Sequence, residues 1–74
     1  MDLGTPPIKR SVTLHGHRTS ITMEEIFWIQ LQKIAKSEGK SINKVIALID
    51  EKRGENSLSS ALRIYILEKL LSVS

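Results

Sequence analysis

The sequence predicts a mostly α-helical protein with a short β-ribbon, assembled as a homodimer. Strand-like residues run from Arg18 to Thr22 and meet a strong helix start with no loop between them. A strand of five residues cannot form a sheet alone, and its simplest partner is its own copy in a second chain. A chain of 74 residues without cysteine also has a marginal core, so oligomerisation is the expected means of stabilisation.

The residues before this stretch divide into an arm and a strand-like segment. Residues 1–8 are rich in Gly and Pro and show no periodicity, so we expect a flexible N-terminal arm. Arg10 to Leu14 alternates polar and apolar residues, which is typical of a strand. His15-Gly16-His17 interrupts the alternation and is compatible with two strands or with one bulged strand. The segment from Arg10 to Leu14 can therefore extend the ribbon or pair elsewhere.

The first helix is expected to begin directly after the strand. Thr22 and Glu25 have the spacing of a capping box, in which the threonine oxygen accepts from a first-turn amide and Glu25 reaches back to the Thr22 amide. The helix should continue to about Glu38 and end at Gly39 in the left-handed conformation.

Two further helices are predicted from their end signals. Ser41 caps a second helix, which ends at Gly54. Either Asn56 or Ser57 caps a third helix, from Leu58 to about Leu71. That helix is apolar nearly all round, which favours burial between two chains.

The apolar side chains of these elements exceed what one small chain can cover. A stripe at helical spacing in the first helix is widened by neighbouring apolar residues, and the third helix adds more. We predict a shared dimer core formed by Ile21, Phe27, Trp28, Leu31, Ile34, Val45, Ile46, Ile49, Leu62 and Tyr65.

Charge favours an anionic partner. The net charge is +3, and the segment from Lys9 to Thr22 holds three Lys/Arg, two His and no acid. The longest apolar run, Val45 to Ile49, is five residues, far too short to span a membrane. The N-terminus has an acid at Asp2 and no apolar segment typical of a secretory signal, so we expect a cytoplasmic protein.

No arrangement of residues predicts catalysis or a cofactor. No Ser-His-Asp or paired-carboxylate constellation can be assembled, so we do not expect an enzyme. His15 and His17 share one face of a strand, but no Cys, and no acid within the ribbon, completes a metal site. We therefore expect no metal, with a metal-responsive regulator acting through these histidines as the alternative.

The polar residues indicate how the anionic partner would be bound. Arg18, Ser20 and Thr22 lie on one face of the strand and suit phosphates and base edges, so they are the predicted base contacts. The start of the second helix offers free amides for a phosphate. The predicted phosphate contacts are Lys40, Ser41, Asn43 and Lys44, with Lys9 and Arg10 adding non-specific attraction.

A helix-turn-helix is the competing interpretation of the two helices joined at Gly39. The second helix, however, exposes Asp50 and Glu51 near its end, where they would meet phosphates unfavourably. The ribbon is the better candidate reader of the major groove.

These residues resemble a known family. Arg18 to Thr22, the helix directly after it, and the stretch Ala35 to Asn43 are similar to the ribbon-helix-helix repressors, which read DNA with a β-ribbon. Small bacterial members are similar over roughly residues 9–70, in the motifs Arg10 to Leu14, Gly16 to Ser20, Phe27-Trp28 and Leu58 to Arg63.

The resemblance implies a domain over residues 9–72 and an intertwined homodimer, whose two strands pair antiparallel between chains in the major groove. Base contacts would come from Arg18, Ser20 and Thr22, and phosphate clamps from Ser41 to Lys44. The break at residues 54–57 and the added third helix depart from the simplest members.

The sequence therefore predicts a sequence-specific regulator that binds double-stranded DNA, with repression as the expected mode and tetramers on DNA as an open alternative. An antitoxin-like module that binds an unidentified protein partner and autoregulates through DNA is the second hypothesis. A purely structural dimerisation module is the third.

Overall fold

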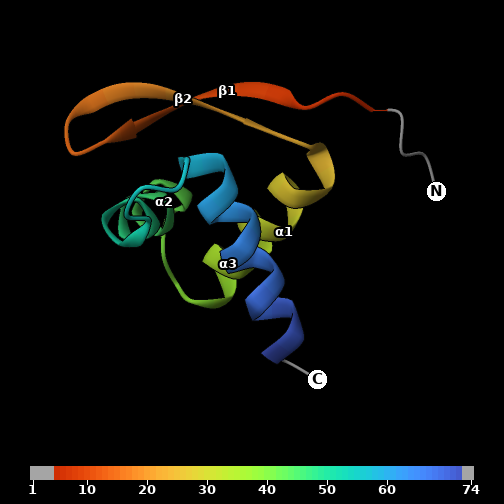
Figure 1. Ribbon diagram of the computed structural model, residues 1–74. Helices are drawn as coiled ribbons and strands as arrows, with labels where there is room; N and C mark the ends of the chain where they lie inside the picture. The colour runs from red at the N-terminus through yellow and green to blue at the C-terminus, as the bar shows by residue number, and fades with distance from the viewer. Residues whose placement is uncertain (1–4, 73–74) are drawn as a thin grey trace.

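The computed structural model describes residues 5–72, in which a two-stranded ribbon lies across three helices (Figure 1). The elements are β1 (Ile8–Leu14), β2 (His17–Met23), α1 (Glu25–Ser37), α2 (Ile42–Lys52) and α3 (Leu58–Ser72). The predicted order of a short ribbon followed by three helices is confirmed. Residues 1–4 of the predicted arm lie outside the described residues, and β1 already begins at Ile8, the last residue assigned to that arm.

The ribbon is an antiparallel hairpin formed within one chain. Ser11 of β1 lies opposite Ser20 of β2, and the strands are joined by His15 and Gly16, whose φ values are 51° and 79°. Two positive φ values in a two-residue loop suit the right-handed twist of a hairpin. The segment therefore forms two strands. Within the chain, this short turn brings β1 alongside β2. The pairing of β2 with its copy in a second chain stays a prediction.

The junction between β2 and α1 also differs from the prediction. Thr22 and Met23 remain in β2, paired with β1, and Glu24 is the N-cap of α1 with no side-chain cap. Glu25 bonds Arg10. The predicted capping box is therefore wrong, because the strand ladder holds Thr22 two residues before the N-cap of α1.

The end of α1 follows the prediction. Gly39 adopts a left-handed φ of 68°, and its amide donates to the carbonyl of Lys36 at 3.1 Å. The amide of Lys40 donates to the carbonyl of Ala35 at 3.0 Å. These two bonds form a Schellman motif, which satisfies carbonyls that the helix leaves free.

Side-chain caps begin the two remaining helices. The Ser41 hydroxyl accepts from the Lys44 amide at 3.1 Å, as predicted for α2. Of the two candidates for α3, Ser57 is the cap, since its hydroxyl accepts from the Ser60 amide at 3.1 Å. Gly54, with φ of 60°, follows the end of α2.

The inner face of the ribbon and the facing sides of the helices form one core within a single chain. Its buried residues are Val12, Leu14, Ile21, Met23, Leu31, Ala35, Val45, Ile46, Ile49, Leu62 and Ile66. Of the ten residues predicted as a dimer core, six are buried here, and Phe27, Trp28, Ile34 and Tyr65 pack partly buried against them. Burial of this set therefore needs no second chain.

None of the helices within residues 5–72 is long and apolar enough to cross a membrane.

Candidate nucleic-acid interface

The alternation of the two strands separates an apolar inner face from a polar outer one. Val12 and Leu14 of β1 and Ile21 and Met23 of β2 are buried against the helices. The alternate residues form what we call the outer ribbon face, and all are exposed: Lys9, Ser11, Thr13, Arg18, Ser20 and Thr22. The register pairs them across the strands as Lys9 with Thr22, Ser11 with Ser20 and Thr13 with Arg18.

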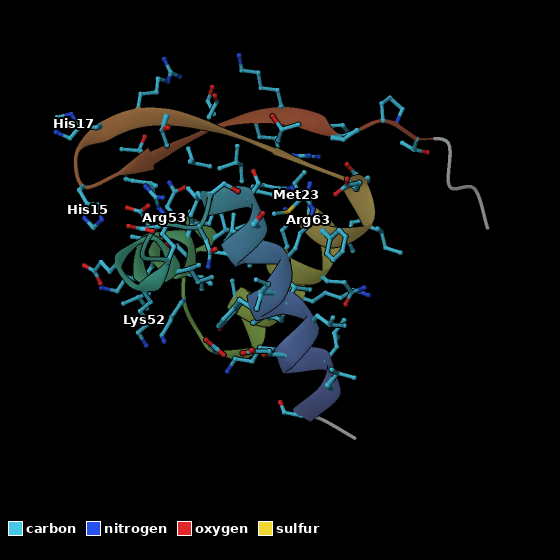
Figure 2. The ribbon with its side chains drawn as sticks, in the orientation of Figure 1. His15, His17, Met23, Lys52, Arg53 and Arg63 are labelled. Atoms are coloured by element: carbon cyan, nitrogen blue, oxygen red, sulfur yellow. The ribbon has the colours of Figure 1, made fainter. Side chains whose placement is uncertain are left out.

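The outer ribbon face combines two cations with four hydroxyl groups. Residues 8–23 contain no acid, so nothing within the ribbon neutralises Lys9 and Arg18. Figure 2 shows side chains on this side of the ribbon pointing away from the helices. Cations and hydroxyls displayed on a two-stranded ribbon are suited to phosphates and to base edges.

The tip of the hairpin lies beside the end of α2. His15 Nε2 lies 3.6 Å from Asp50 Oδ2, and Arg53 Nε donates to Asp50 Oδ1 at 2.6 Å (Figure 2 labels both His15 and Arg53). Arg53 also donates to the carbonyl of Asn56 at 2.7 Å. Within residues 5–72, no three His, Cys, Asp or Glu side chains are grouped closely enough to hold a metal ion.

Arg10 lies on the inner side of the ribbon. It pairs with Ile21 in the register, and its guanidinium donates to Glu25 Oε2 at 2.7 Å and lies 4.5 Å from the centre of the Trp28 ring. Its side chain is 22% exposed. The strand turns Arg10 toward α1 and away from the outer ribbon face, and its phosphate contact stays a prediction.

The opposite end of β2 is fixed to α3. Arg63 Nη2 lies 2.9 Å from Glu24 Oε1 and 3.5 Å from the carbonyl oxygen of Thr22, and its guanidinium lies 5.8 Å from the centre of the Phe27 ring. Hydrogen bonds from its own backbone amide and from Arg63 lower the pKa of Glu24. Arg63 thus links the end of β2 to α3.

The start of α2 forms a second group of predicted contacts. Lys40, Ser41, Asn43 and Lys44 are all exposed. In Figure 1 the connection between α1 and α2 lies on the side of the helices away from the ribbon. The structure therefore does not bring the start of α2 onto the outer ribbon face.

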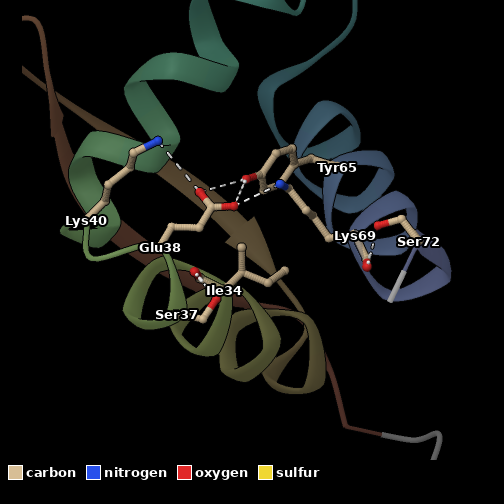
Figure 3. Close-up of polar contacts among 7 residues, drawn as sticks. All are labelled: Ile34, Ser37, Glu38, Lys40, Tyr65, Lys69 and Ser72. Carbon is tan, nitrogen blue, oxygen red and sulfur yellow. Dashed lines mark hydrogen bonds and ion pairs between the residues drawn. The ribbon is translucent and has the colours of Figure 1, made fainter. Parts of the chain in front are cut away.

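A carboxylate balances part of the charge beside this helix start. Glu38 accepts from Lys69 at 2.8 Å and from the Tyr65 hydroxyl at 3.3 Å, and lies 3.7 Å from Lys40 Nζ (Figure 3). The Lys69 ammonium lowers the pKa of Glu38. Lys40 therefore already has an anionic partner, whereas Lys44 presents its charge at the first turn of α2.

Sequence reasoning missed Ser11 and Thr13 as members of the outer ribbon face. The residues carry the same alternation as Arg18, Ser20 and Thr22, but their face depends on how the two segments pair. Reading His15-Gly16 as a two-residue turn would have placed Ser11 opposite Ser20.

Comparison with known proteins agrees with this architecture. The profile of a family described as the ribbon-helix-helix domain matches residues 7–70. A solved structure, that of an uncharacterized protein from Bordetella pertussis Tohama I, has a TM-score of 0.76 and 35% sequence identity to the chain. That match covers 90% of this chain but 58% of the other, so the chain spans little more than half of that protein's length. No curated protein matches the chain. The family profile covers most of the sequence and the folds agree, and the chain therefore belongs to the ribbon-helix-helix domain family.

Proposed function

We propose that this chain is a sequence-specific regulator of transcription that binds double-stranded DNA in the bacterial cytoplasm and acts as a repressor. The ribbon-helix-helix domain is typical of DNA-binding transcription regulators. The observation that carries the proposal is the outer ribbon face, with its two cations, four hydroxyl groups and no carboxylate.

The outer ribbon face enters the major groove, which is wide enough for a two-stranded ribbon. Arg18 makes the principal base contact, because a guanidinium can bond both O6 and N7 of guanine, worth about 1–3 kcal/mol of discrimination. The hydroxyl groups of Ser20 and Thr22 can each donate to an acceptor or accept from a donor on a base edge. The Thr22 hydroxyl is available for this role, since it caps no helix.

Phosphate contacts divide between two surfaces. Lys9 adds a cation to the outer ribbon face itself. Lys40, Ser41, Asn43 and Lys44 form a separate anchoring surface, where the amides and dipole of a helix start attract an anion. Because this surface lies away from the outer ribbon face, its contribution to DNA affinity is tested by a separate variant.

The proposed assembly is a homodimer formed through exposed apolar side chains. Ile64 and Leu67 of α3 are 51% and 54% exposed, and Ile26 of α1 is 59% exposed. Exposed apolar groups at these positions favour association, because a second copy would remove them from water. Two such dimers bound side by side on DNA would form the tetramer that the sequence analysis left as an alternative.

The experiment that tests this function is DNA binding as a function of salt. We expect wild type to prefer some duplex sequences, and Arg18→Ala to flatten that preference. Lys44→Ala should weaken binding to all duplexes alike and reduce the salt slope by about one. Lys52→Ala, the same change at the opposite end of α2, is the matched control and should leave binding nearly unchanged.

Each result is decisive for one part of the proposal. Absence of wild-type binding at low salt would contradict DNA recognition altogether. If Lys44→Ala and Lys52→Ala lower the salt slope equally, the start of α2 has no special role. If Arg18→Ala weakens all sequences alike, the arginine contacts phosphate and does not read bases.

One observation supports an antitoxin-like function as the second candidate. An open groove of about 780 Å³ between α2 and α3 is lined by residues that include Leu48, Ile64 and Tyr65, and a segment of another protein would fit such a surface. Co-purification of a second small protein, lost on Leu48→Glu, would favour this alternative.

A further inference from the structure

The open groove between α2 and α3 has a volume of about 780 Å³. Clefts of about 300–1,000 Å³ with a mainly apolar lining and a few polar groups are the usual sites of small-molecule ligands. The DNA contacts proposed above lie on the outer ribbon face and at the start of α2, so they leave the floor of this groove unused. The chemistry of its lining indicates which ligand would fit.

The floor of the groove is aliphatic. It is formed by Val45, Leu48 and Ile49 of α2 and by Ala61 and Ile64 of α3. Val45 and Ile49 belong to the buried core, Leu48 is half-buried, and Ile64 remains 51% exposed. An aliphatic chain lying on this floor would remove exposed apolar surface from water, which favours its binding.

One end of the groove has its charges balanced within the chain. Glu38 accepts from Lys69 and from the Tyr65 hydroxyl there, and it lies 3.7 Å from Lys40 Nζ (Figure 3). Glu68, which also lines the groove, adds a carboxylate one residue before Lys69. The charged head of an anionic ligand is therefore disfavoured at this end.

The other end of the groove, where α2 ends and α3 begins, presents a cation without a partner. Arg53 is occupied, because it donates to Asp50 at 2.6 Å and to the carbonyl of Asn56 at 2.7 Å. Lys52 lines the groove, and no hydrogen bond or ion pair within residues 5–72 engages its ammonium group. A single cation beside an aliphatic floor suits a ligand with one anionic head and an apolar body.

We infer that the groove between α2 and α3 binds an aliphatic monocarboxylate, with its carboxylate at Lys52 and its chain extending over Leu48 toward Tyr65. Such a site is separate from DNA recognition and adds a small-molecule ligand to the proposed function.

The helices and their charges set the length and the selectivity of the ligand. Lys52 follows Val45 by seven residues in one helix, so the aliphatic floor beside α2 is roughly 10 Å long. A second carboxylate at the far end of the chain would lie close to Glu68, which disfavours dicarboxylates. An ammonium head would be repelled by Lys52.

The test is isothermal titration calorimetry on the full chain, without DNA, with three ligands that share one chain length. Octanoate should bind with a dissociation constant on the order of 1 mM. Octanol, whose head is neutral, should bind about fivefold more weakly, because an exposed ion pair contributes modestly. Octylammonium should bind most weakly of the three.

The decisive variants change the cation and the floor separately. Lys52→Ala should lower the affinity for octanoate about fivefold and leave that for octanol unchanged. Lys52→Glu should reverse the order, so that octylammonium binds more tightly than octanoate. Leu48→Ala should weaken all three ligands alike, because it removes part of the floor. Lys33→Ala, at an exposed position of α1 outside the groove, is the matched control and should behave as wild type.

Several results would overturn the inference. Wild type that does not bind octanoate, or that binds octanol equally well, contradicts it, as does a Lys52→Ala variant that matches Lys33→Ala. If octanoate binds to Leu67→Glu but not to wild type, a second copy of the chain covers the groove. A co-purifying protein that octanoate fails to displace would assign the groove to a protein segment.

These results are independent of the proposed function, because the titrations contain no DNA. Failure of octanoate to bind leaves DNA recognition intact, and failure of DNA binding leaves the ligand site intact. Circular dichroism on each variant confirms that the chain remains folded.

Discussion

Lys9 and Arg10 are adjacent residues of the same charge, and the strand sends them to opposite sides of the sheet. Lys9 belongs to the outer ribbon face, whereas Arg10 contacts Glu25 and Trp28 on the inner side. One Arg10 nitrogen, Nη1, is buried without a hydrogen-bond partner among the described residues. The arginine therefore contributes through its ion pair with Glu25 and its contact with the Trp28 ring.

We expect Arg10→Ala to lower the free energy of unfolding by about 1–2 kcal/mol, because the change removes a charge-assisted hydrogen bond and a contact with an aromatic ring. Urea denaturation measures this directly. The matched control is Lys9→Ala, which removes the neighbouring charge from an exposed position and should change stability by less than about 0.5 kcal/mol. Equal stability of the two variants would contradict the structural role of Arg10.

At the scale of elements, helix ends were predictable and strand pairing was not. Gly39, Ser41 and Gly54 determine their boundaries through local chemistry, namely a left-handed conformation or a hydroxyl cap, and each boundary was found where predicted. The partner of β2 depended on the two-residue turn at His15-Gly16, which requires positive φ at a histidine, an uncommon state for a residue with a side chain. The capping box at Thr22 was misread for the same reason, since its local pattern yields to the pairing of the strand.

The same dependence limited prediction of the site. The alternation placed Arg18, Ser20 and Thr22 on one face, and the structure has them exposed there. It could not add Ser11 and Thr13 to that face, because only the register joins the two strands. Nor could local pattern reveal that α1 supplies the carboxylate that draws Arg10 inward.

The ion pair of Glu38 with Lys69, which joins the end of α1 to α3, should make the free energy of unfolding depend on pH. Lys69 holds the pKa of Glu38 below its ordinary value of 4.5, so the carboxylate stabilises the folded chain fully above about pH 4.5. This stabilisation is lost as the pH falls through the lower pKa of the folded state. We therefore expect Glu38→Gln to be less stable than wild type at neutral pH and to lose less stability on acidification.

Urea unfolding at about pH 6 and about pH 3 measures this difference. Glu55→Gln serves as the control, because Glu55 is an exposed glutamate in the turn between α2 and α3. An acid sensitivity of Glu38→Gln equal to that of wild type would refute the contribution of this ion pair.

At the scale of the whole molecule, the core closes within one chain while apolar side chains stay exposed on α1 and α3. We therefore expect folding and association to be separate in this protein. A variant that blocks association should remain folded, which would not be true of a dimer whose core is shared.

We expect Ile64→Glu and Leu67→Glu to convert the proposed homodimer into a folded monomer, because each places a charge where a second copy would bury an apolar group. Sedimentation velocity reports the oligomeric state and circular dichroism the fold. Gln32→Glu adds the same charge at an exposed polar position of α1 and should leave the dimer intact. Wild type that sediments as a monomer at all concentrations would end the homodimer proposal.

The pairing of β1 with β2 has a consequence for cells that contain several related regulators. Proteins that share strands between subunits can exchange them, and the mixed ribbons that result carry new specificities. Here β1 and β2 form a hairpin within one chain. If this hairpin reads DNA as proposed, hybrid oligomers would display only parental hairpins, and specificity would not depend on the abundance of related proteins.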